Sequence, residues 1–274
     1  MPEPIHSIQN ARIKSAVRLR EASHRRSTGL LLIDGVKEIR QAILGGVEIE
    51  ELFIEENSSP VFDLLELQTN ERSTASMKHL EELTTYVSLS VLEKLSFGNR
   101  NERLVAVAKQ PSVALDRVVD HPHGLILVID QAEKPGNIGA MVRTADAVGA
   151  SAVLLSDPVC EVWNPNAIRA SLGALFRIPI AVGTSKSIIE WLLIRDYQTV
   201  AARVDGSVAY RPFAWSAKNA IVVGSESSGL GPAWHHSKII GMQLPMRGTV
   251  DSLNVSVTAA VLLYEASSCK SLST

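Results

Sequence analysis

The sequence has few of the residues and segments that mark secreted, metal-binding or membrane proteins. Only two of its 274 residues are cysteines, Cys160 and Cys269, so neither a disulfide framework nor a cysteine-based zinc cluster is expected. Nowhere do about 18 uncharged apolar residues follow one another, which argues against a transmembrane helix. The N-terminal segment also lacks the apolar stretch of a signal peptide. We therefore expect a cytoplasmic protein.

Several common catalytic and nucleotide-binding motifs are also missing. The sequence contains no G-x-x-x-x-G-K-[ST] loop, and no G-x-G-x-x-G follows an expected strand, which argues against a nucleotide hydrolase and a dinucleotide dehydrogenase. A serine hydrolase would place glycine two residues before its nucleophile, but Ser225 stands at that position relative to Ser227. A hydrolase is therefore a minor alternative.

The histidines do not indicate a metal site. His121 and His123 flank a proline, and His235 and His236 are adjacent, without a carboxylate or cysteine at ligand spacing. Pairs of this kind are typical of surface turns and linkers. We therefore expect no bound metal.

The charge pattern gives a local indication of nucleic acid binding. The net charge is −2 at pH 7, so the whole molecule has no overall attraction to RNA. The first thirty residues are nevertheless basic, because two acidic side chains, Glu3 and Glu21, stand against Arg12, Lys14, Arg18, Arg20, Arg25 and Arg26. No aromatic residues are interleaved for base stacking, and a solvated helix face remains the alternative.

Apolar periodicity indicates a short α/β part followed by a longer alternating part. Residues 31–56 are typical of a strand, an amphipathic helix ended by Gly45 and Gly46, and a second strand. The pattern recurs loosely over 57–108, where MKHLEELTTYVSLSVLEKLS has helical spacing and RLVAVAKQP resembles a strand. Later strands are expected at 125–130, 151–156, 178–182, 198–204, 219–224 and 239–244, with helices at 138–148, 166–175, 185–195 and 252–267. This alternation predicts a parallel sheet covered on both faces.

A domain boundary is expected between these two parts. Residues 109–124, KQPSVALDRVVDHPHG, hold prolines and a glycine between apolar segments. We therefore expect a small α/β domain over 1–110, a linker over 111–123 and a larger α/β domain over 124–274. The first of these contains no catalytic signature.

The stretch from 124 to 150 combines a buried strand, a Pro-Gly-Asn loop and a helix. Apolar residues fall on one face of the helix, and Arg143 lies almost opposite them. Open α/β sheets bind ligands beside the carboxyl ends of their strands, so Arg143 is a candidate ligand-binding residue. A solvated helix arginine is the simpler alternative.

Two later stretches also end strands in polar, glycine-containing loops. AIVVGSESSGLGP, residues 220–232, places Gly224, Glu226 and Gly229 after a buried strand. In residues 242–267, Ser252 precedes a helix and is explained by N-capping. Asn254 then falls in the first turn, beside backbone N–H groups that suit a polar ligand.

Together the three stretches resemble the SpoU/TrmH family of S-adenosylmethionine-dependent RNA ribose 2′-O-methyltransferases, within the knotted SPOUT class. The residues that match the three family motifs in order are Asn137, Gly139, Arg143 and Thr144; Gly224, Glu226 and Gly229; and Pro245, Met246, Ser252, Leu253, Asn254 and Ser256. The N-terminal part, with NARIK, LLIDGVKEIR and VEIEELFI, resembles the ribosomal-protein-like substrate-binding domain of the rRNA-modifying branch. Asp34 stands where that branch more usually has glutamate.

The resemblance implies a fold, a cofactor and a set of site residues. It implies a deep trefoil knot in the C-terminal domain, a homodimer, and S-adenosylmethionine bound without metal. The implied cofactor-binding residues are Gly224, Leu244, Met246, Ser252, Leu253 and Asn254, and the implied catalytic residues are Arg143, Asn137, Glu226, Ser252 and Asn254. For RNA contacts we predict Arg12, Lys14, Arg25 and Arg26.

The implied reaction is methylation of a ribose 2′-hydroxyl, most simply in ribosomal RNA. A tRNA ribose methyltransferase and a catalytically silent RNA-binding or ribosome-assembly factor are the alternatives. Arginine is a poor free-standing base because its guanidinium group does not give up its proton in proteins. Arg143 would instead hold a neighbouring phosphate and stabilise the developing alkoxide, and the proton would pass to that phosphate, to Glu226 or to water.

Overall fold

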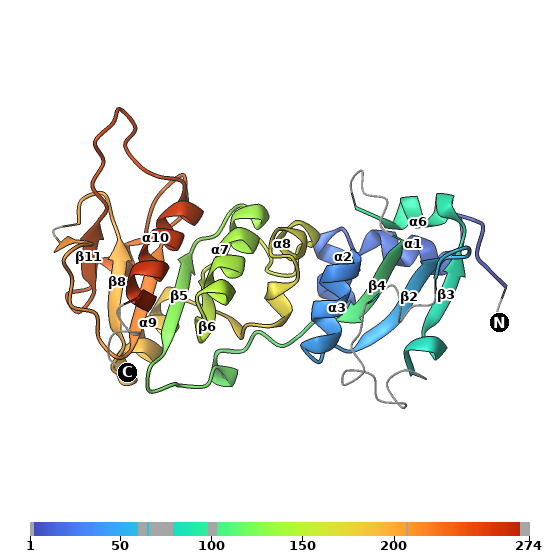
Figure 1. Ribbon diagram of the computed structural model, residues 1–274, viewed down its shortest axis with the longest axis horizontal. Coiled ribbons are helices and arrows are strands. Elements are labelled where there is room, and N and C mark those ends of the chain that lie inside the picture. Colours follow the sequence, from blue (N-terminus) through green and yellow to red (C-terminus); the bar gives the residue numbers. More distant parts are fainter. Residues whose placement is uncertain (1–2, 60–64, 66–78, 98–102, 207, 269–274) are drawn as a thin grey trace. The chain divides into compact units, whose positions relative to one another are not determined.

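The computed structural model describes residues 3–59, 65, 79–97, 103–206 and 208–268 (Figure 1). Contacts divide the chain into two units, Met1–Pro111 with Val162–Arg177, and Ser112–Glu161 with Ile178–Thr274. The sequence did not indicate that 162–177 would pack with the N-terminal residues, and the expected domain limits stay a prediction. Cys269 lies outside the described residues.

The first unit is built on a four-stranded mixed sheet in the order β1-β4-β2-β3. Its strands are β1 (Leu30–Asp34), β2 (Ile49–Glu55), β3 (Thr84–Val87) and β4 (Leu104–Lys109). β4 runs antiparallel to β1 and β2, whereas β2 and β3 are parallel. The helices are α1 (Ala11–Arg18), α2 (Ala22–Thr28), α3 (Val36–Leu44), α6 (Leu89–Leu95) and α8 (Pro165–Ala170), with a 3-10 turn at Ala174–Phe176.

The helical prediction over MKHLEELTTYVSLSVLEKLS is partly wrong. Residues 79–82 are helical, Thr84–Val87 forms β3, and Leu89–Leu95 is helical again, as α6. β-Branched and aromatic side chains favour a strand, and pairing with β2 satisfies its backbone. α6 then packs with α1 on one face of the sheet, over buried side chains that include Phe53 and Val105. Met77 and Lys78 of that stretch lie outside the described residues.

The second unit contains the parallel sheet that the alternation predicts. Its seven strands have the order β7-β6-β5-β10-β8-β11-β9, and every neighbouring pair is parallel. The strands are β5 (Leu125–Asp130), β6 (Ala152–Ser156), β7 (Ile180–Gly183), β8 (Gln198–Ala202), β9 (Val208–Ala209), β10 (Asn219–Val223) and β11 (Ile240–Gln243). The six expected strands are confirmed to within a few residues at their ends, and the short β9 was not expected.

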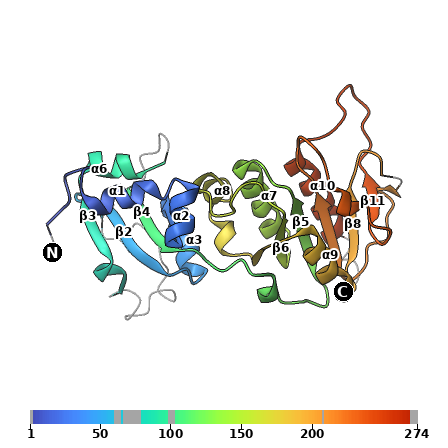
Figure 2. The same ribbon diagram turned by 180° about the vertical axis from the view of Figure 1, so that it is seen from behind.

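Helices cover both faces of this sheet, as Figures 1 and 2 show from opposite sides. α7 (Pro135–Ala147) and α10 (Val255–Ser268) pack against each other, and α10 also contacts β5 and β10. On the other face, α9 (Ser185–Ile194) and the 3-10 turn Pro232–His235 pack over buried side chains of β5, β6 and β10. Alternate residues of these strands therefore enter two separate apolar layers.

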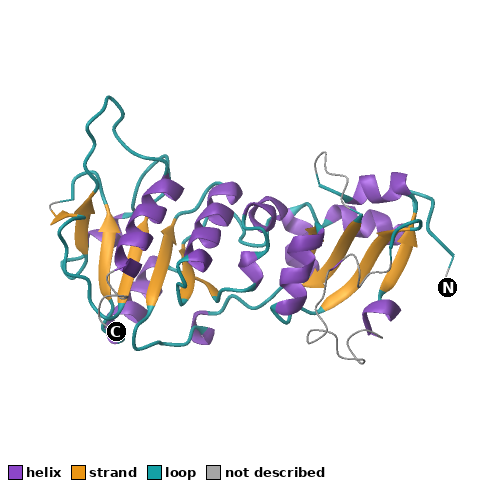
Figure 3. Cartoon of the chain, viewed as in Figure 1, coloured by secondary structure: helices purple, strands orange, loops and turns teal. Residues whose placement is uncertain are grey.

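The chain leaves the two central strands, β5 and β10, toward opposite edges of the sheet. β5 is followed by α7 and by β6 on one side, whereas β10 is followed by β11 on the other side of the sheet. α7 starts with proline at its first position, where a missing N–H costs nothing. A divergence of this kind leaves an open crevice at the carboxyl ends of two parallel strands. Figure 3 shows the loops that leave this edge of the sheet.

Within the described residues, no helix combines the length and the apolar character needed to cross a membrane.

Candidate functional site

A cluster of polar side chains is centred on Glu226, in the loop that follows β10. Its Oε1 accepts hydrogen bonds from Nδ2 of Asn137 at 2.9 Å and from Nδ2 of Asn254 at 2.6 Å. Its Oε2 forms an ion pair with the ammonium group of Lys134. Lys134 and Asn137 come from the start of α7 and Asn254 precedes α10, so with the loop of Glu226 three distant parts of the chain meet at one carboxylate.

The side chain of Asn254 makes two different contacts, one through its nitrogen and one through its oxygen. Its Nδ2 donates to Glu226, while its Oδ1 accepts from the backbone N–H of Ser256 at 3.0 Å and so caps α10. The expectation that Ser252 caps this helix is therefore wrong, as is the placement of Asn254 in the first turn, because α10 begins at Val255. Ser252 is instead exposed on the preceding loop.

Lys134 is a member of this cluster that the sequence did not single out. It precedes Pro135 at the N-terminus of α7, and about two thirds of its side chain is exposed. Glu226 lies 92 residues away in the sequence, so neither helical spacing nor a local motif indicates the pair. Its position at the carboxyl end of β5, opposite the end of β10, was the available signal.

The surroundings of Glu226 favour its ionised form. Lys134 and then Asn137, by hydrogen bonding to the carboxylate, hold the pKa of Glu226 below its usual value. In return, Glu226 raises the pKa of Lys134. Both side chains are therefore charged near neutral pH, and the carboxylate is in the state that accepts a proton or a hydrogen bond.

The glycine-containing loop that carries Glu226 is tightly folded. A side chain on Gly224 would place its Cβ 2.3 Å from the backbone carbon and oxygen of Gly229, which itself has a φ of 69°. At the end of the loop, the backbone N–H of Gly231 donates at 2.8 Å to the fully buried carboxylate of Asp130, which closes β5. Backbone packing and one buried carboxylate thus fix the loop between β5 and β10.

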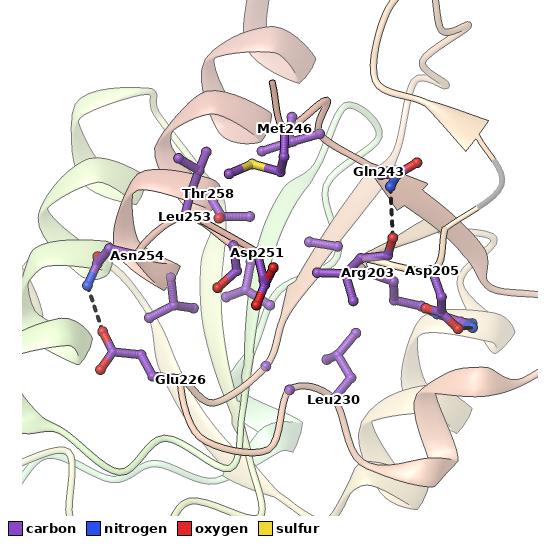
Figure 4. Close-up of a pocket in the computed structure, with 18 of the residues that line it drawn as sticks. Arg203, Asp205, Glu226, Leu230, Gln243, Met246, Asp251, Leu253, Asn254 and Thr258 are labelled. Carbon is purple, nitrogen blue, oxygen red and sulfur yellow. Dashed lines mark hydrogen bonds and ion pairs between the residues drawn. The ribbon is translucent and has the colours of Figure 1, made fainter. Parts of the chain in front are cut away.

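A large open cavity of about 1040 Å³ lies between this loop and the segment that leads into α10. Figure 4 shows Glu226 and Asn254 on one side of it and the apolar side chains of Leu230, Met246 and Leu253 around it. All six residues predicted to bind a cofactor line it, namely Gly224, Leu244, Met246, Ser252, Leu253 and Asn254. Asp251 also lines this cavity and was not predicted.

The opposite side of the cavity holds a second charged pair. Arg203 donates through Nε at 2.9 Å and Nη2 at 2.7 Å to the two carboxylate oxygens of Asp205. This hydrogen bonding lowers the pKa of Asp205 to about 2. Nearby, Nε2 of Gln243 donates to the carbonyl oxygen of Val204 at 2.8 Å (Figure 4). The cavity therefore presents apolar walls between two clusters of charged and polar groups.

The structure does not bring Arg143 into the Glu226 cluster. Arg143 is exposed on the third turn of α7, and its side chain forms no hydrogen bond or ion pair with any described residue. It is also not among the residues that line the cavity. The expectation that Arg143 faces away from the core is confirmed, because Ile138, Met141 and Val142 form the buried side of this helix.

Arg25 is wrong as a predicted RNA contact. Its side chain is 1% exposed, and its Nη1 donates to the carbonyl oxygens of Leu19 at 2.9 Å and Arg20 at 2.8 Å. These carbonyls follow the C-terminus of α1, where unpaired acceptors need a donor and positive charge is favourable. Arg20 likewise donates, at the C-terminus of α6, to the carbonyl oxygens of Lys94, Leu95 and Ser96.

The other predicted RNA contacts lie on the surface of the first unit. Arg12 is exposed but forms an ion pair with Glu51 and donates to the hydroxyl oxygen of Thr85 at 2.6 Å. Lys14 and Arg26 are exposed on α1 and α2. These three residues therefore remain predicted RNA contacts.

Two protein families match the chain. Residues 124–264 match the SpoU rRNA Methylase family, and residues 10–106 match the MRM3-like substrate binding domain. Together the two matches account for the motif-bearing C-terminal part and for most of the N-terminal part.

Individual relatives match the chain over nearly its whole length. The 23S rRNA (guanosine(2553)-2′-O)-methyltransferase RlmP of Bacillus subtilis is 26% identical over 95% of this chain and 97% of its own. A crystal structure of an RNA 2′-O ribose methyltransferase is 35% identical, with a TM-score of 0.79 over 96% of this chain and 98% of its own. The SpoU methyltransferase AviRb from Streptomyces viridochromogenes, solved in complex with AdoMet, is 26% identical, with a TM-score of 0.83 over 96% and 98%.

Proposed function

The chain belongs to the SpoU rRNA methylase family, and we propose that it transfers a methyl group from S-adenosylmethionine to a ribose 2′-hydroxyl in ribosomal RNA. The observation that carries this proposal is the Glu226 cluster. It joins Asn137 and Asn254, two residues of separate family motifs, to an ionised carboxylate beside the large cavity. Such a site can hold a sugar hydroxyl and receive its proton.

The cavity fits S-adenosylmethionine in size and chemistry. Its volume of about 1040 Å³ is at the upper end of small-molecule sites, and Leu230, Met246 and Leu253 supply apolar surface for an adenine ring. Gly224 leaves the wall flat, where any Cβ would collide with Gly229. Asp251 and Glu226 add negative charge that suits a cationic sulfonium. When bound, this cofactor supplies an electrophilic methyl group.

The residues of the chain then hold the ribose and accept the proton of its 2′-hydroxyl. Asn137 and Asn254 fix the orientation of the Glu226 carboxylate, which accepts a proton or a hydrogen bond from the 2′-hydroxyl. We assign the Arg143 guanidinium a contact with the adjacent phosphate and the developing alkoxide. Ser252, exposed on the cavity wall, is assigned a hydrogen bond to cofactor or ribose.

A ribosomal substrate is supported by the large part of this chain that matches an rRNA methyltransferase. RlmP, which is named as a 23S rRNA methyltransferase, matches 95% of this chain, including the segment that matches a substrate-binding domain. We therefore assign RNA recognition to residues 1–110, linked through 111–123 to the catalytic residues 124–274. Methylation of tRNA, and RNA binding without catalysis, are the alternatives to be tested.

We also propose that the enzyme is a homodimer. Val257, Val261 and Tyr264 form an exposed stripe on α10 at helical spacing, with 47, 37 and 57% of their surface exposed. A second copy that covers this stripe would complete the site and bring in its own Arg143. Sedimentation velocity should give a dimer for the wild type and a monomer for Val261→Asp.

Three further parts of the proposal concern topology, metal and location. α10 passes back beyond β11 to pack on β10, β5 and α7, which supports a knotted path for the C-terminal segment. No three His, Cys, Asp or Glu side chains within the described ranges are arranged to hold a metal, so chelators should leave activity unchanged. The scarcity of cysteine supports a location in the cytoplasm.

The decisive experiment is transfer of a labelled methyl group to RNA. Ribosomal RNA from cells lacking this gene should accept label from S-adenosylmethionine, whereas the same RNA from wild-type cells, already methylated, should not. DNA of the same sequence should also fail, because it has no 2′-hydroxyl. Mapping the ribose methylation would then identify the nucleotide.

Three outcomes would contradict the proposal. Label found on a base would change the reaction, and label found in tRNA alone would change the substrate. RNA binding without any transfer, under conditions where S-adenosylhomocysteine binds, would favour the silent RNA-binding factor. Glu226→Ala is the matched control, and it should abolish transfer.

A further inference from the structure

Lys134 is placed to control the central carboxylate of the site. It ends the loop after β5 and immediately precedes α7, while Glu226 lies in the loop after the neighbouring parallel strand β10. The ammonium group contacts Oε2 of Glu226, whereas both asparagine amides bind Oε1. The two oxygens are thus held from different sides, and the carboxylate cannot rotate without losing a partner.

We propose that Lys134 is a positioning residue of the methyl-transfer site, which holds the Glu226 carboxylate charged and aligned against Asn137 and Asn254. This inference rests on the proposed function, since it concerns the same reaction. Without Lys134, Oε2 would have no donor among the described side chains that contact Glu226. The carboxylate could then turn and would take up a proton more readily.

Few other charges act on this carboxylate. Glu133 accepts a hydrogen bond from the hydroxyl of Ser227, and its charge bears on Lys134. The other charged side chains of these segments and of α7 and α10 are Asp130, Arg143, Asp146, Arg247, Asp251 and Glu265. None of them contributes to the lowered pKa of Glu226, which arises from Lys134 and Asn137.

The arrangement predicts how methyl transfer depends on pH. If the ionised Glu226 is the working form, kcat/KM falls as the pH drops through the pKa of this carboxyl. Removal of Lys134 raises that pKa, so the fall begins at higher pH. At a pH on the acid side of the profile, the variant should lose about threefold in kcat/KM, as expected for a largely exposed ion pair. The alkaline plateau should change less.

The test compares Lys134→Met with Lys134→Arg and a matched control. Methionine keeps the length of the side chain but cannot donate, and arginine restores the charge. Lys186→Met, on the exposed surface of α9 away from the cavity, controls for loss of a surface lysine. The acid limb of kcat/KM should move to higher pH in Lys134→Met only. Coincident limbs in Lys134→Met and wild type would overturn the inference.

A second measurement does not depend on activity. NMR titration of 13C-labelled glutamate carboxyls in the full-length protein, with Glu226→Gln to assign the signal, reports the pKa of Glu226 directly. The pKa of Glu226 should be higher in Lys134→Met than in the wild type, and should return to the wild-type value in Lys134→Arg. An unchanged titration in Lys134→Met would reject the role of Lys134 even if transfer were observed. A shifted titration without any methyl transfer to RNA would instead reject the proposed function and keep the contact.

Discussion

The positions of charged and polar residues in the sequence relate differently to their positions in the structure in the two units of this chain. In the first unit, Arg25 and Arg26 are neighbours in the sequence, yet one is buried against backbone carbonyls and the other lies on the surface. In the second unit, Asn137 and Glu226 are 89 residues apart, yet their side chains are joined by a 2.9 Å hydrogen bond.

The difference shows at which sequence positions the place of a side chain in the fold can be predicted best. A residue that follows a parallel strand is delivered to one known edge of the sheet, whatever the length of the intervening chain. A residue on a helix points in a direction that changes by about 100° with each step, so a basic run cannot lie on one surface. Clustered charge in a sequence is therefore weaker evidence of a binding surface than polar residues at strand ends.

The sharpest test of this comparison is Arg143, a helix residue to which we assign a catalytic contact. Arg143→Ala should lower kcat by about a thousandfold, the upper range for loss of one group that stabilises developing negative charge. Its thermal stability should be nearly unchanged, because the side chain is exposed and has no described partner. Methyl-transfer kinetics and a thermal melt measure the two effects. Activity within a few-fold of wild type would make Arg143 an ordinary surface residue.

Gly224→Ala tests the rule for strand ends. The added Cβ would lie 2.3 Å from the backbone of Gly229, so the loop that carries Glu226 must move. Calorimetry should show about a hundredfold weaker binding of S-adenosylhomocysteine, equivalent to roughly 2.7 kcal/mol. Gly248→Ala is the control, because it lines the same cavity but its Cβ would meet nothing within 4 Å. Equal affinities for both variants would show that the glycine loop does not shape the cofactor site.

The contrast between Arg25 and Arg26 can be measured as stability. Arg25→Ala removes a buried charged donor from the carbonyl groups of Leu19 and Arg20 and should reduce the free energy of unfolding by about 3 kcal/mol. Arg26→Ala should change it by less than about 0.5 kcal/mol. Urea denaturation of both variants gives the comparison. If the two effects were similar, burial would not distinguish these neighbouring arginines.

The smallest expected effect concerns RNA affinity. Lys14→Glu should weaken RNA binding by about tenfold at low salt, and should lower the slope of log affinity against log salt by roughly 0.7–0.9 for each lost phosphate contact. Lys37→Glu, on the exposed surface of α3, is the matched control for charge reversal in the same unit. Binding titrations at several salt concentrations measure both. Parallel slopes for the two variants would remove α1 from the RNA-binding surface.

The sequence predicted the parallel sheet well because its strands are continuous apolar runs. β5 spans Leu125–Asp130, as expected to the residue. Prediction was weaker where structure depends on partners elsewhere in the chain. Thr84–Val87 becomes a strand only through pairing with β2, and the start of α10 is fixed by the side chain of Asn254 rather than Ser252. The Lys134–Glu226 pair was missed because only the folded sheet brings its two loops together.

The double contact of Asn254 links the site to the order in which the chain is synthesised. Only one orientation of the amide lets it cap α10 with its oxygen and hold Glu226 with its nitrogen. Asn137 and Glu226 leave the ribosome before Asn254. At a synthesis rate of roughly 5–20 residues per second, Asn137 does so several seconds earlier. During that interval the nascent chain holds a cluster that lacks the Asn254 donor to Glu226. The cluster is therefore complete only after α10 has been synthesised and has packed on the sheet.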